Sequence, residues 1–292
     1  MSVVIQKSVK ILHTIQALNT QLAQPRKEGL KIGLVPTMGA LHQGHISLVK
    51  AAKKQVDIVL VSIFVNPTQF NNPEDLKAYP RTIEEDTALL LEAGVDIVFA
   101  PEAEEMYPLA PMLKFDFGYL ESILEGAFRP GHFNGVGVVV SKLFNITKPD
   151  FAFFGQKDLQ QVAIIRKMVE DLSFQLELVI VPTVREEDGL ALSSRNRRLS
   201  MEDRAKAILL SQQLRVARVE LLAGRSWFDI QIEVTHKFDQ CSGVRLEYFE
   251  LVKTNSLEIA SEANIEQVDL KNYSLCTAAF VGDVRLIDNL PI

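Results

Sequence analysis

Cysteine is scarce in this sequence, and the marks of a secreted or membrane protein are missing. The 292 residues include two cysteines, Cys241 and Cys276. So few cysteines indicate free thiols in a reducing cytosol, with a single disulfide as the alternative. The first residues lack the cationic start, apolar run and cleavage site of a signal peptide, and no run of 18 apolar residues occurs. We therefore expect a cytoplasmic protein without a membrane span.

An excess of positive charge is also missing. Lysine and arginine number 31 against 37 acidic residues, which gives a net charge of −6. Nucleic-acid-binding proteins usually carry a basic excess or a basic stripe, so we expect no nucleic acid as a partner. The Walker A loop and the Gly-x-Gly-x-x-Gly turn are absent as well. Gly135 and Gly137 lack the third glycine of such a turn, and we expect them to allow close packing.

Alternating apolar runs and helical patterns predict an α/β protein. A chain of about 300 residues buries roughly three quarters of its unfolded surface, so no disulfide or metal is needed for a core. Apolar runs, β-branched at residues 57–65, predict buried strands at residues 31–35, 57–65, 95–100, 151–154 and 176–181. Helices are predicted between them, at residues 46–55, 82–93 and 158–172. Thr82 and Glu85 have the spacing of a capping box, and Gly94 is placed to end that helix. Such alternation forms βαβ units on a parallel sheet.

Two domains are predicted from the length and from a change of composition near residues 186–189. We expect a Rossmann-type parallel-sheet domain over residues 1–186 and a smaller α+β domain over residues 187–292. In the second domain, Ser200 is placed to cap a long helix and Gly224 to end it. The expected elements there are helices at residues 201–223 and 226–238, and half-buried strands at residues 244–252, 275–281 and 284–287.

The segment after the first strand, PTMGALHQGH, has the features of a phosphate site. It joins a strand to a helix, and the free backbone N–H groups of a helix N-terminus bind anions. Gly39 and Gly44 let the backbone approach a ligand closely. His42 and His45 can donate to phosphate oxygens as charge builds up in a transition state. The alternatives are a capping histidine or a zinc pair, although neither a His-Glu-x-x-His pattern nor a third ligand is near.

Polar clusters follow two other predicted strands, at the edge where open α/β sheets bind ligands. The first contains Asn66 and Gln69, whose amides offer donors and acceptors to a hydroxy acid; a plain turn around Pro67 is the alternative. The second, GQKD, opens a helix. There Lys157 can neutralise phosphate charge, and Asp158 can accept from a ribose hydroxyl or merely cap the helix.

A third cluster, LSSRNRR, lies just past the expected domain boundary. Its hydroxyls and the guanidinium fork of Arg195 suit phosphate oxygens. A run of charge alone indicates a solvated loop, which is the alternative. The position of the cluster predicts a lid contributed by the second domain.

In this order, the motifs resemble those of the pantothenate synthetase family, the pantoate–β-alanine ligases. The similar segments are PTMGALHQGH, IFVNPTQF, YPRT, FRPGHFNGV, FGQKDLQQ and LSSRN. The resemblance covers residues 30–200 densely and the tail more loosely, through RLIDN. The His-x-Gly-His element alone would indicate only the broader nucleotidyltransferase superfamily.

The resemblance implies a reaction and its partners. Pantoate would attack the α-phosphate of ATP to give pantoyl adenylate and pyrophosphate. β-Alanine would then attack the adenylate to give AMP and pantothenate, the precursor of coenzyme A. The resemblance also implies a Rossmann-type domain that binds ATP, a C-terminal domain that closes over it, Mg²⁺ with the ATP, and a homodimer.

Site residues are implied in the same way. ATP would be bound by Met38, Gly39, Ala40, Leu41, His42, Gln43, Gly44, His45, Gly155, Gln156, Lys157, Asp158, Val184, Leu192, Ser193, Ser194 and Arg195. Among these, His45, His42 and Lys157 would be catalytic, and Val184 would line the adenine pocket. Pantoate would be bound by Gln69, Gln161 and Asn66.

The sequence departs from the family pattern at a few positions. Leu192 stands where the family often has methionine, and Gln156 where glutamate is common. Glu85 and Asp86 stand where some members place metal ligands, but Leu89 cannot ligate. The magnesium ligands are therefore unknown, with Asp86 as a possible one, and phosphates can hold much of such a metal.

Two other functions remain open from the residues. One is a nucleotidyltransferase that activates another small acid and does not need an amine. The other is a nucleotide-sensing or RNA-binding module without activity, which the acidic balance disfavours.

Overall fold

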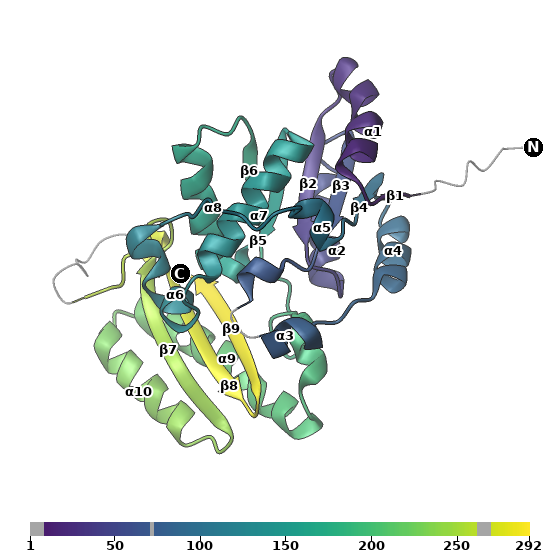
Figure 1. Ribbon diagram of the computed structural model, residues 1–292. Helices are drawn as coiled ribbons and strands as arrows, with labels where there is room; N and C mark the ends of the chain where they lie inside the picture. Colours follow the sequence, from purple (N-terminus) through teal and green to yellow (C-terminus); the bar gives the residue numbers. More distant parts are fainter. Residues whose placement is uncertain (1–8, 71–72, 262–269) are drawn as a thin grey trace, which may run out of the picture. The chain divides into compact units, whose positions relative to one another are not determined.

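The computed structural model describes residues 9–70, 73–261 and 270–292, which form two compact units (Figure 1). The first unit comprises Met1–Gly155 and Ile164–Val181, and the second comprises Gln156–Ala163 and Pro182–Ile292. The chain therefore enters the second unit after Gly155, returns at Ile164, and leaves the first unit again after Val181. The boundary expected at residue 187 lies close to that last crossing. Nothing in the sequence indicated the short excursion at Gln156–Ala163.

A parallel sheet organises the first unit, as the sequence predicted. Its six strands run in the order β1-β4-β3-β2-β5-β6, and every pair is parallel. The strands are β1 (Lys10–Leu12), β2 (Ile32–Thr37), β3 (Ile58–Ile63), β4 (Ile97–Phe99), β5 (Phe151–Gly155) and β6 (Glu177–Val181). From β2, the chain adds β3 and β4 on one side and later β5 and β6 on the other, so the strand order reverses there.

Helices connect these strands, and several of them were not anticipated. The helices are α1 (Ile15–Lys27), α2 (Gln43–Ala52), α3 (Pro73–Ala78), α4 (Ile83–Glu92), α5 (Ala103–Met106), α6 (Leu124–Phe128), α7 (His132–Thr147) and α8 (Leu159–Asp171). Short 3₁₀ segments are η1 (Pro67–Gln69), η2 (Gly118–Glu121) and η3 (Gln156–Asp158). The helix α2 begins earlier than expected because His42, before its first residue, caps it.

The helix α7 shows burial overriding local propensity. Glycine and valine are poor helix formers, and this helix contains two glycines followed by Val138, Val139 and Val140. Most of its residues are buried all the same. A Cβ atom on Gly135 would lie 2.3 Å from the carbonyl oxygen of Thr68, which confirms that this glycine serves close packing.

The capping box predicted at the start of α4 is wrong. Thr82 is the N-cap residue, but its side chain accepts no backbone N–H. Its hydroxyl donates instead to Oδ2 of Asp86, at 3.1 Å. In a capping box the threonine oxygen would accept a backbone N–H of the helix, whereas here the hydroxyl donates to a buried carboxylate in a stronger, charge-assisted bond, so the threonine turns inward. Gly94 has φ of 76° and ends the helix as expected.

The second unit packs two helices against a small antiparallel sheet. Its helices are α9 (Met201–Leu222) and α10 (Trp227–Asp239), with a 3₁₀ segment η4 (Ser194–Arg198) before them and η5 (Leu270–Asn272) after. The strands β7 (Val244–Lys253), β8 (Tyr273–Val281) and β9 (Val284–Pro291) lie in that order. Trp227, Phe238, Phe249 and Leu275 are at the centre of its core. Ser200 caps α9 by accepting the N–H of Asp203, as predicted.

One strand of this sheet is more buried than expected. The central strand β8 is buried along nearly its whole length rather than on alternate residues. It pairs with β7 on one side and β9 on the other. A central strand between two neighbours, covered by helix α9, leaves little surface for water.

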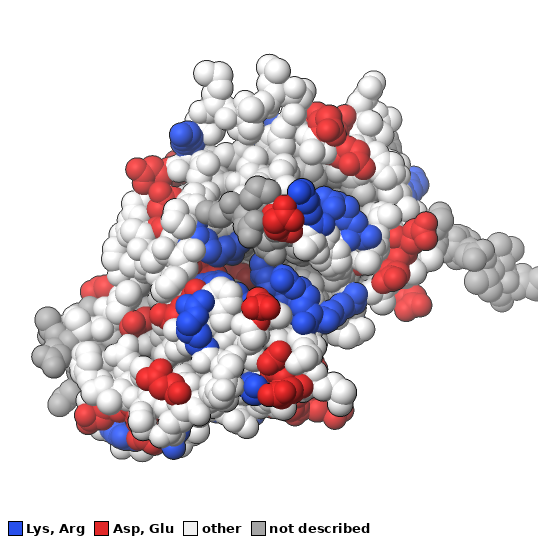
Figure 2. All heavy atoms as spheres, turned by 60° about the horizontal axis from the view of Figure 1, so that its bottom comes forward, with Lys and Arg blue, Asp and Glu red and all other residues white. Residues whose placement is uncertain are grey.

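Charges of both signs are spread over the surface. Figure 2 shows lysine and arginine side chains beside aspartate and glutamate on the face that it draws. On α9, for example, Lys206 pairs with Glu202 at 2.6 Å. None of the helices described in this structure has the length and the apolar character needed to cross a membrane.

Candidate active site

The carboxyl ends of β2 and β3 place two predicted clusters at one edge of the first unit's sheet. The strand β2 ends at Thr37 and leads into the histidine loop, which we define as residues 38–45. Its neighbour β3 ends at Ile63, shortly before Asn66 and η1. Because the strand order reverses between β2 and β5, this edge is where an open parallel sheet forms a crevice for ligands.

The histidine loop is held by a buried carboxylate from α4. Gly39 and Ala40 have φ of 83° and 50°, so the chain turns sharply through two left-handed residues. The N–H groups of Ala40 and Leu41 then point at Asp86, donating to Oδ2 at 2.9 Å and to Oδ1 at 2.7 Å. Asp86 is only 1% exposed. Successive amides of this kind form an anion-binding concavity, and here the protein's own carboxylate fills it.

Both histidines of the loop accept a backbone N–H at the same ring nitrogen, Nδ1. Nδ1 of His42 accepts the N–H of Gly44 at 3.1 Å, and Nδ1 of His45 accepts the N–H of His42 at 3.3 Å. An acceptor nitrogen carries no proton, so each neutral ring has its proton on Nε2. The ring centroids lie 4.1 Å apart. The pair therefore carries two N–H donors, each fixed by a backbone contact on the other side of its ring.

Several of the backbone amides that the sequence suggests for a phosphate at this loop are hydrogen-bonded within the protein. The amides of Ala40 and Leu41 are bound to Asp86, and those of His42 and Gly44 are bound to imidazole nitrogens. The amide of His45 donates to the carbonyl of His42 at 2.8 Å. Folding has used these backbone donors to shape the loop. The imidazole Nε2–H groups are therefore candidate donors to a ligand that these backbone contacts do not use.

Asn66 is saturated by contacts within the protein. Its Oδ1 accepts from the amide and hydroxyl of Thr68 and from the hydroxyl of Tyr107, and its Nδ2 donates to Gln69 and to the carbonyl of Gly135. Burial raises the pKa of Tyr107, which keeps its phenol a donor. Asn66 is 1% exposed. The structure therefore makes this side chain a support for η1.

Gln69 is the member of this cluster that is held by its surroundings on three sides. Its Oε1 accepts from Asn66, its Nε2 donates to the sulfur of Met38, and its carbonyl lies 2.9 Å from Nδ1 of His132. The contact with Met38 brings together the ends of β2 and β3, two segments that the sequence assigned to one site. The helix α7 thus helps to hold the turn that carries Gln69.

In the second unit, a single asparagine holds the GQKD turn. Nδ2 of Asn289 donates to the carbonyl oxygens of Gln156 and Lys157, at 2.9 and 2.7 Å. Asp158 is exposed, Gln161 is half-buried on α8, and Gly155 ends β5. The C-terminal strand β9 therefore fixes the backbone on which Lys157 is carried.

A buried ion pair supports that strand. Arg185 binds both oxygens of Asp288, at 2.6 and 2.9 Å, and donates to the carbonyl of Asn289 at 3.0 Å. Asp288 is 4% exposed and also accepts the N–H of Asn289 at 2.8 Å. A bidentate arginine–carboxylate pair is both strong and geometrically specific, so the position of residue 289 is well defined.

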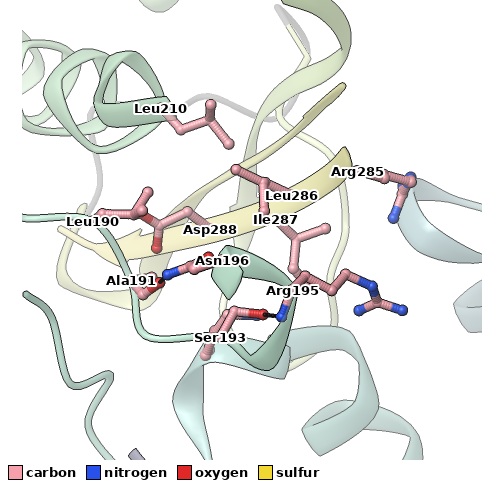
Figure 3. A pocket seen from close by; sticks show the side chains of 11 residues that line it. Leu190, Ala191, Ser193, Arg195, Asn196, Leu210, Arg285, Leu286, Ile287 and Asp288 are labelled. Atoms are coloured by element: carbon pink, nitrogen blue, oxygen red, sulfur yellow. Dashed lines mark hydrogen bonds between the residues drawn. The ribbon is translucent and has the colours of Figure 1, made fainter. Parts of the chain in front are cut away.

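Positive side chains gather at a pocket in the same unit (Figure 3). The pocket is lined by Lys157, Leu190, Ala191, Ser193, Arg195, Asn196, Leu210, Arg285, Leu286, Ile287 and Asp288. Three of these residues are cations, of which Arg285 is paired with Glu247 at 2.7 Å, and the one carboxylate, Asp288, is paired with Arg185. A net positive pocket with a hydroxyl suits an anionic ligand such as a phosphate.

The LSSRN segment is shaped by local hydrogen bonds. Ser193 caps η4 by accepting the N–H of Arg195 at 3.3 Å, which Figure 3 marks with a dashed line. The N–H of Leu192 donates to the carbonyl of Val184 at 3.0 Å, so two residues assigned to ATP lie side by side. Ser194 and Arg195 are half-buried. Asn196 binds Glu186 and the carbonyl of Ala191, which ties the segment to the strand-like turn before it.

Metal ligands are not assembled in the described part of the chain. No group of three or more histidine, cysteine, aspartate or glutamate residues there could hold a metal ion. Asp86, the possible magnesium ligand, uses both oxygens on loop amides. The alternative of a zinc pair at the histidine loop also receives no third ligand among these residues.

Sequence reasoning missed four residues that shape the site. Asn289, Asp288 and Arg285 lie in the RLIDN segment and His132 in FRPGHFNGV, two segments that the resemblance covers without giving these residues a role. The contacts of Asn289, Asp288 and His132 join residues more than 60 positions apart, as between His132 and Gln69. Motif spacing carries no information about such contacts.

Comparison with known proteins covers nearly the whole chain. The sequence model of the family described as pantoate-beta-alanine ligase matches residues 10–291. The pantothenate synthetase of Bacteroides thetaiotaomicron is 49% identical over 284 residues, which cover 97% of this chain and 98% of that protein. The pantothenate synthetase of Cytophaga hutchinsonii is 48% identical over 280 residues, covering 96% and 98% of the two chains.

Solved structures agree with this match. The pantothenate synthetase of Thermus thermophilus has a TM-score of 0.89 at 43% identity and covers 97% of this chain and 99% of that one. A pantoate-beta-alanine ligase from Francisella tularensis, solved with beta-gamma ATP and beta-alanine, has a TM-score of 0.81 at 37% identity, with 97% and 98% coverage. The two-unit architecture, the histidine loop and these matches together show that the chain belongs to the pantoate–β-alanine ligase family.

Proposed function

We propose that this protein condenses pantoate with β-alanine and consumes ATP, through a pantoyl-adenylate intermediate, with release of pyrophosphate and AMP. A carboxylate does not readily accept an amine, and adenylation gives it a good leaving group. The observation that supports the proposal most strongly is the pair of Nε2-protonated histidines at the strand-order reversal, in a chain that matches the ligase family from residue 10 to residue 291.

The histidines would act as donors to the reacting phosphates. We propose that Nε2–H of His45, assisted by His42, stabilises charge on the phosphate oxygens as pantoate attacks. Donors that are already oriented contribute most where charge develops in the transition state. Both rings are oriented by backbone contacts at Nδ1, so they need little rearrangement when the nucleotide binds.

The second unit would supply positive charge. We propose that Lys157, Ser193, Ser194 and Arg195 contact the phosphates, and that Val184 and Leu192 lie at the adenine. The cationic pocket beside Lys157 and Arg195 supports this assignment. Gly155, Gln156 and Asp158 would complete the nucleotide site, together with residues 38–45, where Ala40 and Leu41 contribute through shape because their amides are taken.

Pantoate would be held by amide side chains. We propose that Gln69 and Gln161 bind it, and that Gln69 lies beside the path of β-alanine. Asn66 would act through Gln69, since its own hydrogen-bonding groups are satisfied within the protein. The reaction then depends mainly on positioning of pantoate and ATP, which can contribute several kcal/mol, about 7–11 in well-oriented cases.

Magnesium would enter with the nucleotide. We propose that Mg²⁺ is bound by the ATP phosphates and water, because the described residues assemble no carboxylate cluster and Asp86 is bound to amides. The metal would neutralise phosphate charge. The chain's own contribution would be the cations and imidazoles that surround those phosphates.

The resemblance to the family supports two further proposals. One is that the protein is a homodimer, which light scattering of the purified chain tests directly. The other is that it works in the cytoplasm, which fractionation of the source cells tests.

The proposed reaction is tested by an assay with ATP, pantoate and β-alanine. We expect AMP and pantothenate in equal amounts, with one pyrophosphate for each. Without β-alanine, pyrophosphate release should stop after about one turnover per site, because the adenylate has no acceptor. Sustained pyrophosphate release without the amine would instead indicate a nucleotidyltransferase, and binding of ATP without any product would indicate a nucleotide-binding module.

A further inference from the structure

The side chain of Asn289 clamps both peptide groups that flank Lys157. The carbonyl of Gln156 belongs to the peptide before the Cα atom of Lys157, and the carbonyl of Lys157 belongs to the peptide after it. One amide group donates to both oxygens, at 2.9 and 2.7 Å. Because each peptide group is planar, fixing both carbonyls restrains the backbone angles of Lys157 and so the direction of its Cα–Cβ bond.

The clamp is itself rigid. Asn289 is 3% exposed and follows Asp288 on β9. Arg185 grips the carboxylate of Asp288 with both terminal nitrogens and also binds the carbonyl of Asn289. Oδ1 of Asp288 accepts the backbone N–H of Asn289. Both the N–H and the carbonyl of Asn289 are thus hydrogen-bonded, so the position of its Cα atom is well defined.

A lysine needs such help more than other cations do. Its ammonium is a point charge on a long, flexible stem, so the stem adds freedom to any movement of the Cα atom. A displacement of 1 Å in a reacting group can cost about 100-fold in rate. The local sequence around GQKD supplies no constraint of this kind, because the clamp comes from the C-terminal strand, 132 residues away.

We infer that Asn289, backed by Asp288 and Arg185, is a positioning residue for Lys157 in the ligase reaction. The inference rests on the proposed function, since it assumes that Lys157 meets the phosphates of ATP. Asn289 itself need not touch any substrate. Its effect would pass through the backbone of residues 156 and 157.

The test is a pair of substitutions that reverse or remove the clamp. Asn289→Asp keeps the shape but faces two carbonyls with a carboxylate, and Asn289→Ala removes the donor. We expect turnover to fall about 10-fold in the alanine variant and about 100-fold in the aspartate variant. Thr277→Val is the control, because its buried hydroxyl donates to the carbonyl of Tyr248, on the neighbouring strand. It should lower the melting temperature and leave turnover unchanged.

A double-mutant cycle with Lys157→Ala separates positioning from loss of stability. If Asn289 acts through Lys157, then Asn289→Ala should cause no further loss once the lysine side chain is gone. Independent, multiplying losses would overturn the inference, and so would wild-type turnover in both Asn289 variants. If Asn289→Asp fails to fold, the alanine variant completes the same cycle. An inactive wild-type chain would contradict the proposed function instead, so the two failures are distinguishable.

Discussion

The histidine loop and the Lys157 turn are held by opposite means. In the first unit, a buried carboxylate accepts the N–H groups of the loop, at Ala40 and Leu41. In the second unit, a buried amide donates to the carbonyl groups of the turn. In both places a polar side chain from a remote part of the sequence takes up backbone groups. In the proposed reaction, the side chains on these segments supply the chemistry, imidazoles from the loop and an ammonium from the turn.

The hydrogen bonds that hold the loop and the turn also differ in strength, because those of the loop go to a charged carboxylate and those of the turn come from a neutral amide. Hydrogen bonds to an ionised group are roughly twice as strong as those between neutral groups. The histidine loop contains Ala40 in a left-handed conformation, which is strained for a residue with a Cβ atom. The Lys157 turn is held by neutral bonds. We therefore expect the loop to depend more heavily on its carboxylate than the turn depends on its amide.

The largest effect should follow from His45→Ala. If the loop acts through its imidazoles rather than its amides, this change should lower turnover by about 10²- to 10³-fold, the scale for one transition-state donor. Steady-state kinetics with all three substrates measure it. Lys50→Ala, at an exposed position of α2 outside the histidine loop, is the control. Near-normal turnover in a folded His45 variant would contradict the role that we give to the ring.

Removal of the loop's carboxylate should come next. Asp86→Ala would leave the buried amides of Ala40 and Leu41 without an acceptor, so the free energy of unfolding should fall by about 3 kcal/mol. Turnover should also fall, because the histidines lose their support. Asp86→Asn keeps one acceptor oxygen, so its free energy of unfolding should lie between those of the wild type and the alanine variant. Urea unfolding checks the prediction, and wild-type stability in the alanine variant would show that the loop holds itself.

A smaller effect is expected at the support of Gln69. Gly135→Ala would bring a Cβ atom within 2.3 Å of the carbonyl of Thr68, so η1 must shift. Overpacking of this kind costs about 1–3 kcal/mol, and the KM for pantoate should rise while the KM for ATP stays the same. Gly137→Ala, on the same helix, meets the side chains of Phe115 and Phe117 instead and serves as the control. Equal changes in both KM values would refute the link to pantoate.

The smallest effect belongs to an ion pair outside both backbone clamps. The amide of Leu190 and then the guanidinium of Arg204 hold the pKa of Asp188 below its usual value of 3.8. A lowered pKa means that this carboxylate contributes stability above pH 3.8 and loses it as the pH falls through the folded-state pKa. Asp188→Asn should therefore weaken the acid dependence of unfolding. The turnover of this variant at neutral pH should equal that of the wild type. A loss of turnover would indicate that the loop around Asp188 also supports the site.

Much of the fold followed from the sequence because the responsible physics is local. Apolar runs followed by glycine or proline predicted five of the strands, within a few residues of their bounds. The helix α7 was not predicted, because its glycines and valines are poor helix formers. Packing against η1 and its neighbours stabilises it instead. The short strand β1 has no pattern of its own and depends on pairing with β4.

In the candidate site, too, local features could be inferred from the sequence and contacts between remote residues could not. The histidines, Gln69 and Lys157 can be proposed for the site from the sequence, since residue type and position after a strand indicate their chemistry, and these roles stay predictions. The partners of the backbone could not be proposed in this way. Asp86 lies 45 residues beyond Leu41, and Asn289 lies 132 residues beyond Lys157. The sequence predicts that both imidazoles and amides of the loop meet a phosphate, and the contacts with Asp86 take up two of those amides.

The excursion of Gln156–Ala163 into the second unit sets a limit on dissection of the molecule. A single cut after Val181 would not yield two self-sufficient pieces. The C-terminal fragment would carry Asn289 without the turn that it binds, and the N-terminal fragment would carry Lys157 without its clamp. Complementation between separately expressed halves would therefore have to rebuild a shared strand-and-turn contact before either half could assist the other.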